Sequence, residues 1–137
     1  MTVILIDVNV VLDVLAEREP FVSDSQAVLQ LVEAGAVDGV LAAHSVTTLH
    51  YLLGKHLSKA KARKALEDLL QLLGVVAVDE DRLRHALAMN WTDFEDAVQA
   101  ACAEKAAADY LVTRDKRGFN TSAVRAVTPA ELVALVT

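Results

Sequence analysis

The sequence predicts one α/β domain spanning residues 1–137, with a mainly parallel central sheet of about five strands and helices on both faces. Apolar residues make up 54% of the chain, above the roughly 45–50% of average domains, as expected for strands covered on both faces. Short apolar runs alternate with longer segments of helical periodicity. Only 5 glycines and 2 prolines occur in 137 residues, so we expect no linker and no internal domain boundary.

The first third of the chain predicts a strand followed by two helices. TVILI (2–6) is a short apolar run that ends at a polar DVN, which indicates a buried strand. VVLDVLAER (10–18) has helical character. SDSQAVLQLVEAG (23–35) begins with residues that favour helix caps and stops at Gly35, so a second helix is expected there.

The middle of the chain predicts two strands that enclose a pair of helices. VDGVLAA (37–43) is the second strand. SVTTLHYLLGKHL (45–57) and SKAKARKALEDLLQLLG (58–74) are helices, with Ser58 as the expected cap between them. VVAV (75–78) is the third strand.

The last part of the chain repeats the alternation. DEDRLRHALAMN (79–90) and TDFEDAVQAACAEKAAA (92–108) predict helices, and DYLVTRD (109–115) carries the fourth strand. AVRAVTP (123–129) predicts a short fifth strand, and PAELVALV (129–136) a final helix. Strands separated by helices imply right-handed crossovers and a parallel sheet.

Acidic residues follow two of the predicted strands directly. Asp7, with Asn9, follows the first strand, and Thr113, Arg114 and Asp115 follow the fourth. Functional sites of such sheets form at the carboxyl ends of the strands, so we expect Asp7 and Asp115 to meet there. Asp7 could instead cap a helix, a task that Asn9 could also perform, and Asp115 could be a turn residue. Thr113 could hydrogen-bond a carboxylate, a metal-bound water or the local backbone.

A third group of acids lies at the start of the helix predicted near Thr92. Thr92 and Glu95 match the Thr-x-x-Glu capping box, which gives Glu95 a structural role. Asp93 suits the first turn of a helix, where the helix dipole favours negative charge. Asp96 gains less from either effect and lies on the same face as Asp93. We therefore predict that Asp96 belongs to the acidic site, with Asp93 as an additional member.

Converging carboxylates favour a bound cation. Two charges about 5 Å apart at an effective dielectric constant near 20 repel by about 3 kcal/mol. A cluster of this kind takes up protons or binds a metal ion, and hard oxygen ligands select Mg²⁺ or Mn²⁺ over zinc. Such an ion can orient a water nucleophile and neutralise a phosphate oxygen, which is the chemistry of phosphodiester hydrolysis.

The charge distribution gives a second candidate surface. The net charge of −6 argues against a generic nucleic-acid binder. Nevertheless, five of the thirteen basic residues lie between positions 55 and 64, and no acid occurs from Gly39 to Leu66. This basic segment could hold RNA phosphates, together with Arg114, or form an ordinary solvated helix face. Its members are Lys55, Lys59, Lys61, Arg63 and Lys64.

Other classes of site and location are disfavoured. Cys102 is the only cysteine, which predicts a cytoplasmic protein without an internal disulfide, and no activating partner for a catalytic thiol is apparent. The four histidines lack metal-ligand spacing, and neither a Gly-rich phosphate loop nor a GxSxG motif is present. The apolar stretch LLQLLGVVAV (69–78) is too short for a membrane span, and the MTVILID start does not resemble a signal peptide.

The segments LIDVNVVLD and DFEDAVQAACAEKAAADYLVTRD, with their separation, resemble the PIN-domain family, in particular its VapC-like toxin branch. The resemblance covers nearly the whole chain. It implies a Mg²⁺- or Mn²⁺-dependent endoribonuclease in which Asp7, Asp96 and Asp115 are metal ligands and catalytic residues. It also implies that Asn9 supports Asp7, that Asp93 is an added acid of the site, that the protein forms a homodimer, and that a small antitoxin places a basic side chain in the acidic pocket.

The chain departs from the family pattern in one helix. Many PIN domains carry a glutamate in the helix after the second strand, where this sequence has His50 and Tyr51 and no acid. A catalytically weakened PIN fold that acts as a binding module through a protein or RNA partner is therefore the alternative. A phosphatase of the haloacid dehalogenase type also begins with a strand-end aspartate, but it requires a second aspartate where Asn9 stands.

Overall fold

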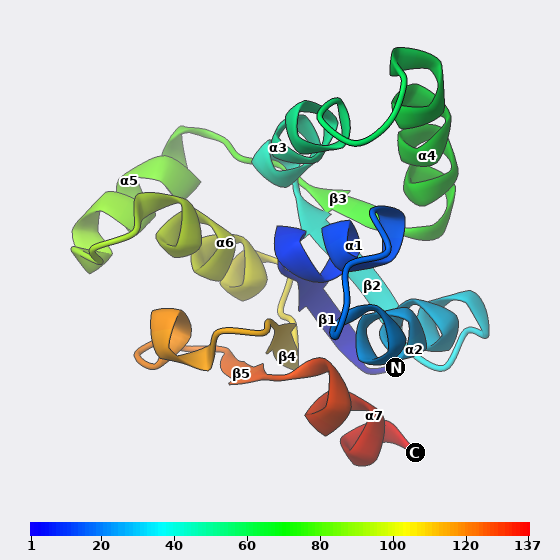
Figure 1. Ribbon diagram of the computed structural model, residues 1–137. Coiled ribbons are helices and arrows are strands. Elements are labelled where there is room, and N and C mark those ends of the chain that lie inside the picture. The colour runs from blue at the N-terminus through cyan, green and yellow to red at the C-terminus, as the bar shows by residue number, and fades with distance from the viewer.

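A computed structural model describes all residues 1–137, and its centre is a five-stranded, fully parallel sheet (Figure 1). The strand order is β3-β2-β1-β4-β5, so β1 lies in the middle between β2 and β4. The predicted fold class is therefore confirmed. The strands span β1 Val3–Ile6, β2 Asp38–Ala42, β3 Gly74–Val76, β4 Tyr110–Val112 and β5 Arg125–Val127.

Seven α-helices and one short 3₁₀ helix connect and cover the strands. The α-helices lie close to the predicted ranges, and Ser58 caps α4 as expected, with its hydroxyl accepting a bond from the Lys61 N–H. The 3₁₀ helix η1 (Lys116–Phe119) was not predicted. The helices span α1 Val8–Leu15, α2 Val22–Glu33, α3 Ala43–Leu53, α4 Lys59–Leu72, α5 Glu80–Met89, α6 Phe94–Lys105 and α7 Pro129–Val136.

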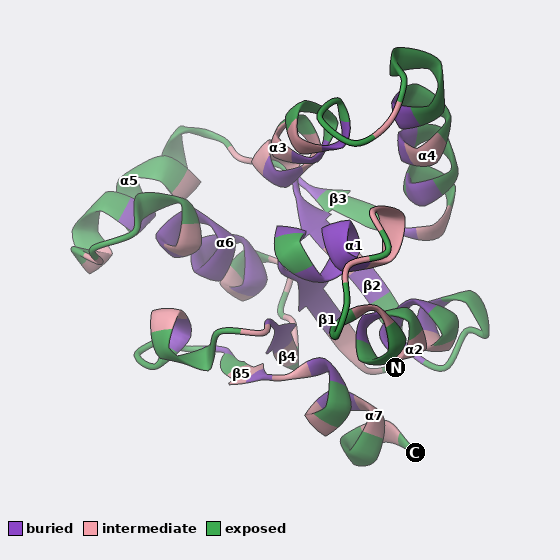
Figure 2. Ribbon diagram, viewed as in Figure 1, coloured by how far each residue is buried: buried purple, intermediate pink, exposed green.

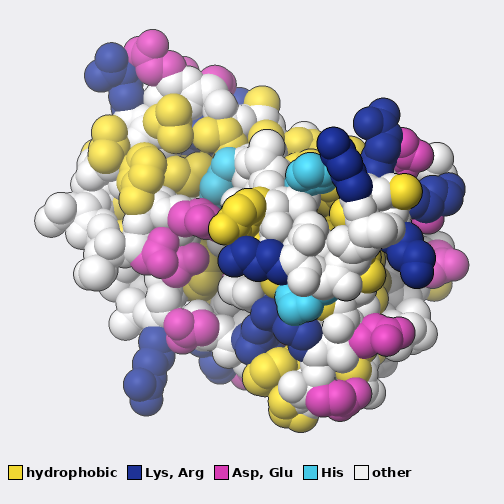
Figure 3. All heavy atoms as spheres, turned by 45° about the horizontal axis from the view of Figure 1, so that its top comes forward, with side chains coloured by type: hydrophobic (Ala, Val, Ile, Leu, Met, Phe, Trp, Pro, Cys, Tyr) yellow, Lys and Arg dark blue, Asp and Glu magenta, His cyan; other side chains and the backbone are white.

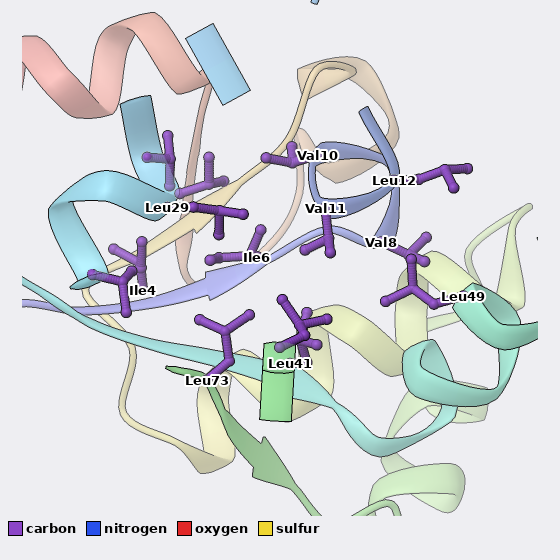
Figure 4. Packing of buried hydrophobic residues seen from close by; sticks show 14 of the residues in the cluster. Ile4, Ile6, Val8, Val10, Val11, Leu12, Leu29, Leu41, Leu49 and Leu73 are labelled. Carbon is purple, nitrogen blue, oxygen red and sulfur yellow. The ribbon is translucent and has the colours of Figure 1, made fainter. Parts of the chain in front are cut away.

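The alternation of side chains along β1 creates two cores. Ile4 and Ile6 belong to the larger cluster, which α1, α2, α3, α4 and α7 complete (Figure 4). Leu5 points to the opposite face and packs in the second cluster, with the alanine-rich α6. Figure 2 shows that α6 is buried over most of its length, because small side chains let it lie close to the sheet. No helix has both the length and the apolarity needed to cross a lipid bilayer.

The start of α2 differs from the prediction. We expected polar residues near Ser23 to cap this helix, but the helix begins at Val22 after Phe21 and has no side-chain cap. Backbone bonds replace the cap, since the Val22 N–H donates to the Arg18 carbonyl and the Ser25 N–H to the Phe21 carbonyl. The turn before the helix therefore satisfies donors that a polar cap would otherwise bind.

Candidate active site

Asp7 lies at the carboxyl end of the central strand and is 5% exposed. Its Oδ1 accepts hydrogen bonds from the Gln99 Nε2 at 3.2 Å and from the backbone N–H of Asn9 at 3.4 Å. Its Oδ2 accepts a bond of 2.8 Å from the Thr113 hydroxyl. The three donors come from α6, α1 and the end of β4, so the carboxylate is fixed from several directions.

Asp7 is also the N-cap of α1. The role as a helix cap and the role as a site residue were considered as alternatives, but they are compatible. The carboxylate serves the helix and still faces Gln99 and Thr113. The suggestion that Asn9 caps the same helix is wrong, because Asn9 lies inside α1 and is exposed. Its side-chain oxygen accepts from the Arg18 Nη2 at 3.3 Å, so Asn9 contacts Asp7 only through its backbone.

Thr113 connects the two strand-end aspartates. Its buried hydroxyl donates to Asp7 and accepts a bond of 3.1 Å from the Asp115 backbone N–H. Asp115 itself is exposed, and its Oδ1 accepts from the Arg117 N–H at 3.2 Å. One hydroxyl therefore sets the spacing between the turns that follow β1 and β4.

The start of α6 brings the third group of acids to the same edge. Asp93 is the N-cap, and its Oδ1 accepts from the Asp96 N–H at 3.0 Å. The predicted capping box of Thr92 and Glu95 is wrong, because the helix begins one residue later and Asp93 takes the capping position. Asp93 therefore has a structural role, while Glu95 is exposed in the first turn.

Asp96 is the electrostatic centre of this group. Its pKa is raised from 3.8 to about 7, first by burial and then by the nearby negative charges of Asp93, Asp7, Glu95 and Asp115. None of these five carboxylates forms an ion pair with a lysine or an arginine. The site therefore concentrates negative charge without a protein cation to balance it.

A glycine lets the segment after β4 approach this centre closely. A Cβ atom on Gly118, in η1, would stand 3.0 Å from the Asp96 Oδ2 and 3.7 Å from the Asp115 Oδ2. Both carboxylates therefore line the same small space in front of Gly118. Asp96 and Asp115 meet here although they are separated by a helix, a strand and a turn in the sequence.

The donor chemistry of the cluster fits a hard divalent cation. All the groups are carboxylate oxygens, and they carry uncompensated negative charge, as Mg²⁺ and Mn²⁺ require. As the side chains stand, no three of them converge at the spacing of a metal site. Asp7, Asp96 and Asp115 are the residues that would hold such an ion.

Two buried polar groups near the site were missed in the sequence. Gln99 is 0% exposed, and its Oε1 has no hydrogen-bond partner. Asp13, in α1, is also 0% exposed and forms ion pairs with Arg18 (2.8 Å) and Arg114 (2.8 Å). Gln99 lies one turn after Asp96 in α6 and on the same helix face, and this spacing could have identified it from the sequence. Nothing in the sequence pointed to Asp13.

Arg114, a predicted RNA-binding residue, contacts an acid and an aromatic ring within the chain. Its Nε lies 2.8 Å from the Asp13 Oδ2, at an angle unsuited to a hydrogen bond, and its guanidinium stacks 3.8 Å from the centre of the Phe21 ring. Because the side chain is held by an acid and an aromatic ring, it ties the segment that carries Asp115 to α1 and α2.

The basic segment forms an exposed surface around the start of α4, and blue side chains gather on that side of the molecule in Figure 3. Two of its members are already paired within the helix, Arg63 with Glu67 at 3.3 Å and Lys64 with Asp68 at 2.9 Å. Lys55, Lys59 and Lys61 have no acidic partner and remain candidates for phosphate contacts.

His50 and Tyr51 occupy the helix where many PIN domains carry a glutamate, and both are exposed. His50 lines a different pocket, together with Lys59 and Arg63 of α4. No side chain of α3 therefore adds an acid to the cluster. His44, at the start of α3, lies close to Glu95, and burial lowers its pKa despite that negative charge.

The family model for the PIN domain matches residues 3–117, which is most of the chain. The chain belongs to the PIN-domain family. The matched part includes Asp7, Asp96 and Asp115, and it ends within η1.

Solved structures share the fold of this PIN domain. VapBC2 from Rickettsia felis, crystallised with a DNA fragment from its promoter, is 12% identical, covers 93% of this chain and 98% of its own, and gives a TM-score of 0.70. FitAcB from Neisseria gonorrhoeae is 24% identical, with coverages of 93% and 98% and a TM-score of 0.66. VapC20 from Mycobacterium tuberculosis, described as a sarcin-ricin loop cleaving toxin, is 14% identical, with coverages of 86% and 94% and a TM-score of 0.70. No curated protein matches the chain.

Proposed function

We propose that this PIN domain is a divalent-metal-dependent endoribonuclease and the toxin component of a toxin–antitoxin pair. The observation that carries the proposal is the group of five carboxylates formed by Asp96 and its four acidic neighbours, none of which is paired with a lysine or an arginine. Phosphodiester hydrolysis needs a cation at such a site, because the substrate itself is an anion. The toxins among the structural neighbours support the substrate class and the partner.

The residues of the chain would divide the work as follows. Asp7, Asp96 and Asp115 would hold Mg²⁺ or Mn²⁺, which supplies a polarised water and neutralises charge on the phosphate. Gln99 and Thr113 orient Asp7, and the Thr113 hydroxyl also fixes the backbone of Asp115. Asp93 holds the first turn of α6, so it positions Asp96 through the backbone.

Partners are proposed on the same basis. An antitoxin would place a basic side chain among the carboxylates, which lack a protein cation, and would thereby replace the metal ion. Lys55, Lys59 and Lys61 would hold RNA phosphates and make binding depend on salt. We further propose a homodimer in the cytoplasm and a single domain that comprises residues 1–137.

The deciding experiment compares wild type with Asp96→Asn on a mixture of structured and single-stranded RNAs, with Mn²⁺, with Mg²⁺ and with chelator. We expect cleavage only with metal ion and only by wild type, because Asn cannot supply the charge that holds the cation. Asp7→Asn should have the same effect. Equal cleavage by either variant would remove that residue from the mechanism.

A PIN fold that binds partners without turnover is the second candidate. The observation that favours it is the absence of an acid on α3, where His50 and Tyr51 are exposed. In that case Mn²⁺ would raise the melting temperature of the wild type but not that of Asp96→Asn, and no RNA in the mixture would be cleaved.

A further inference from the structure

A pocket of about 300 Å³ opens beside the carboxylate cluster. One wall is the turn between α5 and α6, and the other is η1 with the residues that follow it. Asp93 belongs to both the pocket and the cluster, and Gly118, in the opposite wall, faces Asp96. The side chains that matter are Asn90, Trp91, Thr92, Asp93, Arg117 and Asn120.

The pocket presents hydrogen-bonding groups that the protein leaves free. The side chains of Thr92 and Asn120 are exposed and make no hydrogen bond within the chain. Asp93 uses only its Oδ1, for the Asp96 N–H. An amide both donates and accepts, a hydroxyl does the same, and a carboxylate accepts. These groups match the edge of a nucleobase, which offers donors and acceptors in fixed positions.

The two walls are held together, so the pocket has a defined shape. The indole of Trp91 packs edge-on against Phe119, with ring centres 5.9 Å apart and planes at 76°. Phe119 is 2% exposed and anchors η1 in the second core. A fixed spacing between the walls is needed for selecting one base over another, because a flexible pocket adapts to each of them.

Arg117 supplies the positive charge that the site otherwise lacks. Its side chain is exposed, lines the pocket and forms no ion pair. Its backbone N–H donates to Asp115, so the residue lies next to the proposed catalytic centre. An arginine in this place suits a backbone phosphate of the substrate.

We propose that this pocket binds one nucleobase of the RNA substrate, beside the scissile phosphate, and selects it through Thr92, Asp93 and Asn120. Arg117 holds the adjoining phosphate. The pocket thus determines sequence specificity, while the carboxylates perform the reaction. This inference rests on the proposed ribonuclease function.

The experiment is cleavage of an RNA pool whose single-stranded segment is randomised, in Mn²⁺, with sequencing of the new ends. Wild type is compared with Thr92→Ala, Asn120→Ala and Arg117→Gln. Gln26→Ala, which removes an exposed amide from α2, is the matched control. Melting temperatures establish that the variants are folded, which is expected because the side chains of Thr92 and Asn120 form no hydrogen bond in the chain.

We expect wild type to prefer one base at a position next to the cut. Thr92→Ala and Asn120→Ala should reduce that preference about tenfold or more. Arg117→Gln should slow cleavage of all sequences equally and weaken its salt dependence, and the control should behave as wild type. A wild type without base preference, or an unchanged preference in both alanine variants, would overturn the inference.

The failure of the proposed function has a different signature. If wild type cleaves nothing in the pool, the nuclease proposal fails, and the pocket is then tested by binding alone. Asp96→Asn is incubated with the same pool, and the bound RNA is sequenced. Enrichment of a base that disappears in the Asp96→Asn, Asn120→Ala double variant supports the pocket, and binding without enrichment overturns it.

Discussion

Both oxygens of Asp7 are occupied by donors, and these donors differ in origin. The N–H of Asn9 comes from the next turn of the chain, whereas Gln99 and Thr113 come from distant elements. Three hydrogen bonds offset much of the cost of burying a carboxylate that has no cation beside it. They also fix its orientation, so Asp7 would meet a metal ion with one geometry.

Removing the amide donor should therefore weaken metal binding. Gln99→Leu keeps the size of the side chain but leaves Oδ1 of Asp7 with only the long backbone bond. We expect the affinity for Mn²⁺ to fall about 10- to 100-fold, as for other groups that orient a ligand. Calorimetric titration measures this without RNA. Thr113→Val removes the corresponding hydrogen bond to Oδ2 of Asp7. Unchanged Mn²⁺ affinity in both variants would contradict the proposal that Gln99 and Thr113 orient Asp7.

The raised pKa of Asp96 makes stability depend on pH in a particular direction. Between the ordinary value of 3.8 and the folded value of about 7, the folded protein keeps a proton that the unfolded chain releases. Stability without metal therefore falls as the pH rises from about 4 to about 7. Below this window both states are protonated, and above it the full destabilisation remains.

Asp96→Asn should abolish that slope. We expect the variant to be more stable than wild type at pH 8 by about 2 kcal/mol, allowing for solvent screening of a partly exposed group, and equally stable at pH 4. Urea unfolding in the presence of a chelator provides the measurement. Saturating Mn²⁺ should reverse the order at pH 8, because wild type gains binding energy. If the free energy of unfolding changed with pH in the same way in both proteins, the pH dependence would not come from the raised pKa of Asp96.

At the scale of elements, η1 lies close to Asp96 of α6, and the lack of a Cβ at residue 118 leaves room for that carboxylate. Gly118→Ala would place a carbon 3.0 Å from the Asp96 Oδ2, closer than side chains normally approach. We expect the carboxylate to be displaced and the Mn²⁺ affinity to fall at least tenfold, with a small loss of stability. Gly54→Ala, whose nearest atoms would be 3.4–3.5 Å away, is the control and should leave affinity unchanged. Equal Mn²⁺ affinity in the two variants would show that the close approach of η1 is not needed for metal binding.

Caps were the elements' least predictable feature, for a physical reason. Thr92 and Asp93 are both good capping residues, and neighbouring candidates compete through small energy differences. Asp93 takes the position in the structure, and sequence spacing does not reveal which of the two will do so. Gln99 was missed for a similar reason, since an amide in an alanine-rich helix is usually solvated and only the docking of α6 buries it.

The β–α alternation, by contrast, was readable because it depends on local patterns. TVILI is apolar on both sides of the strand, which only a sheet covered on two faces can satisfy. Parallel strands end at one edge, so Asp7 and Asp115 had to lie near each other once the fold was assigned. The contacts of Asp13 with Arg18 and Arg114 depend on how α1 packs against the segment after β4, and no local pattern encodes that.

At the scale of the whole molecule, two elements lie beyond the part that the family model matches: β5, which is the edge strand of the sheet, and α7, which packs on the larger core. Leu132 of α7 is 0% exposed and packs in the larger core. We expect Leu132→Ala to lower the free energy of unfolding by about 2–4 kcal/mol, as for buried leucines generally. Leu135→Ala, at a residue that is 45% exposed, should change it by less than about 0.5 kcal/mol. Equal effects in urea unfolding would show that α7 does not belong to the cooperative unit.

The two distant donors to Asp7 lie 92 and 106 residues further along the chain. A ribosome makes Asp7 well before it makes Gln99 and Thr113. A nascent chain that stops before residue 96 has the aspartate without Gln99 and Thr113, and without Asp96 and Asp115. The proposed site is therefore complete only after Asp115 has been made, and fragments that end before it would lack the proposed nuclease centre.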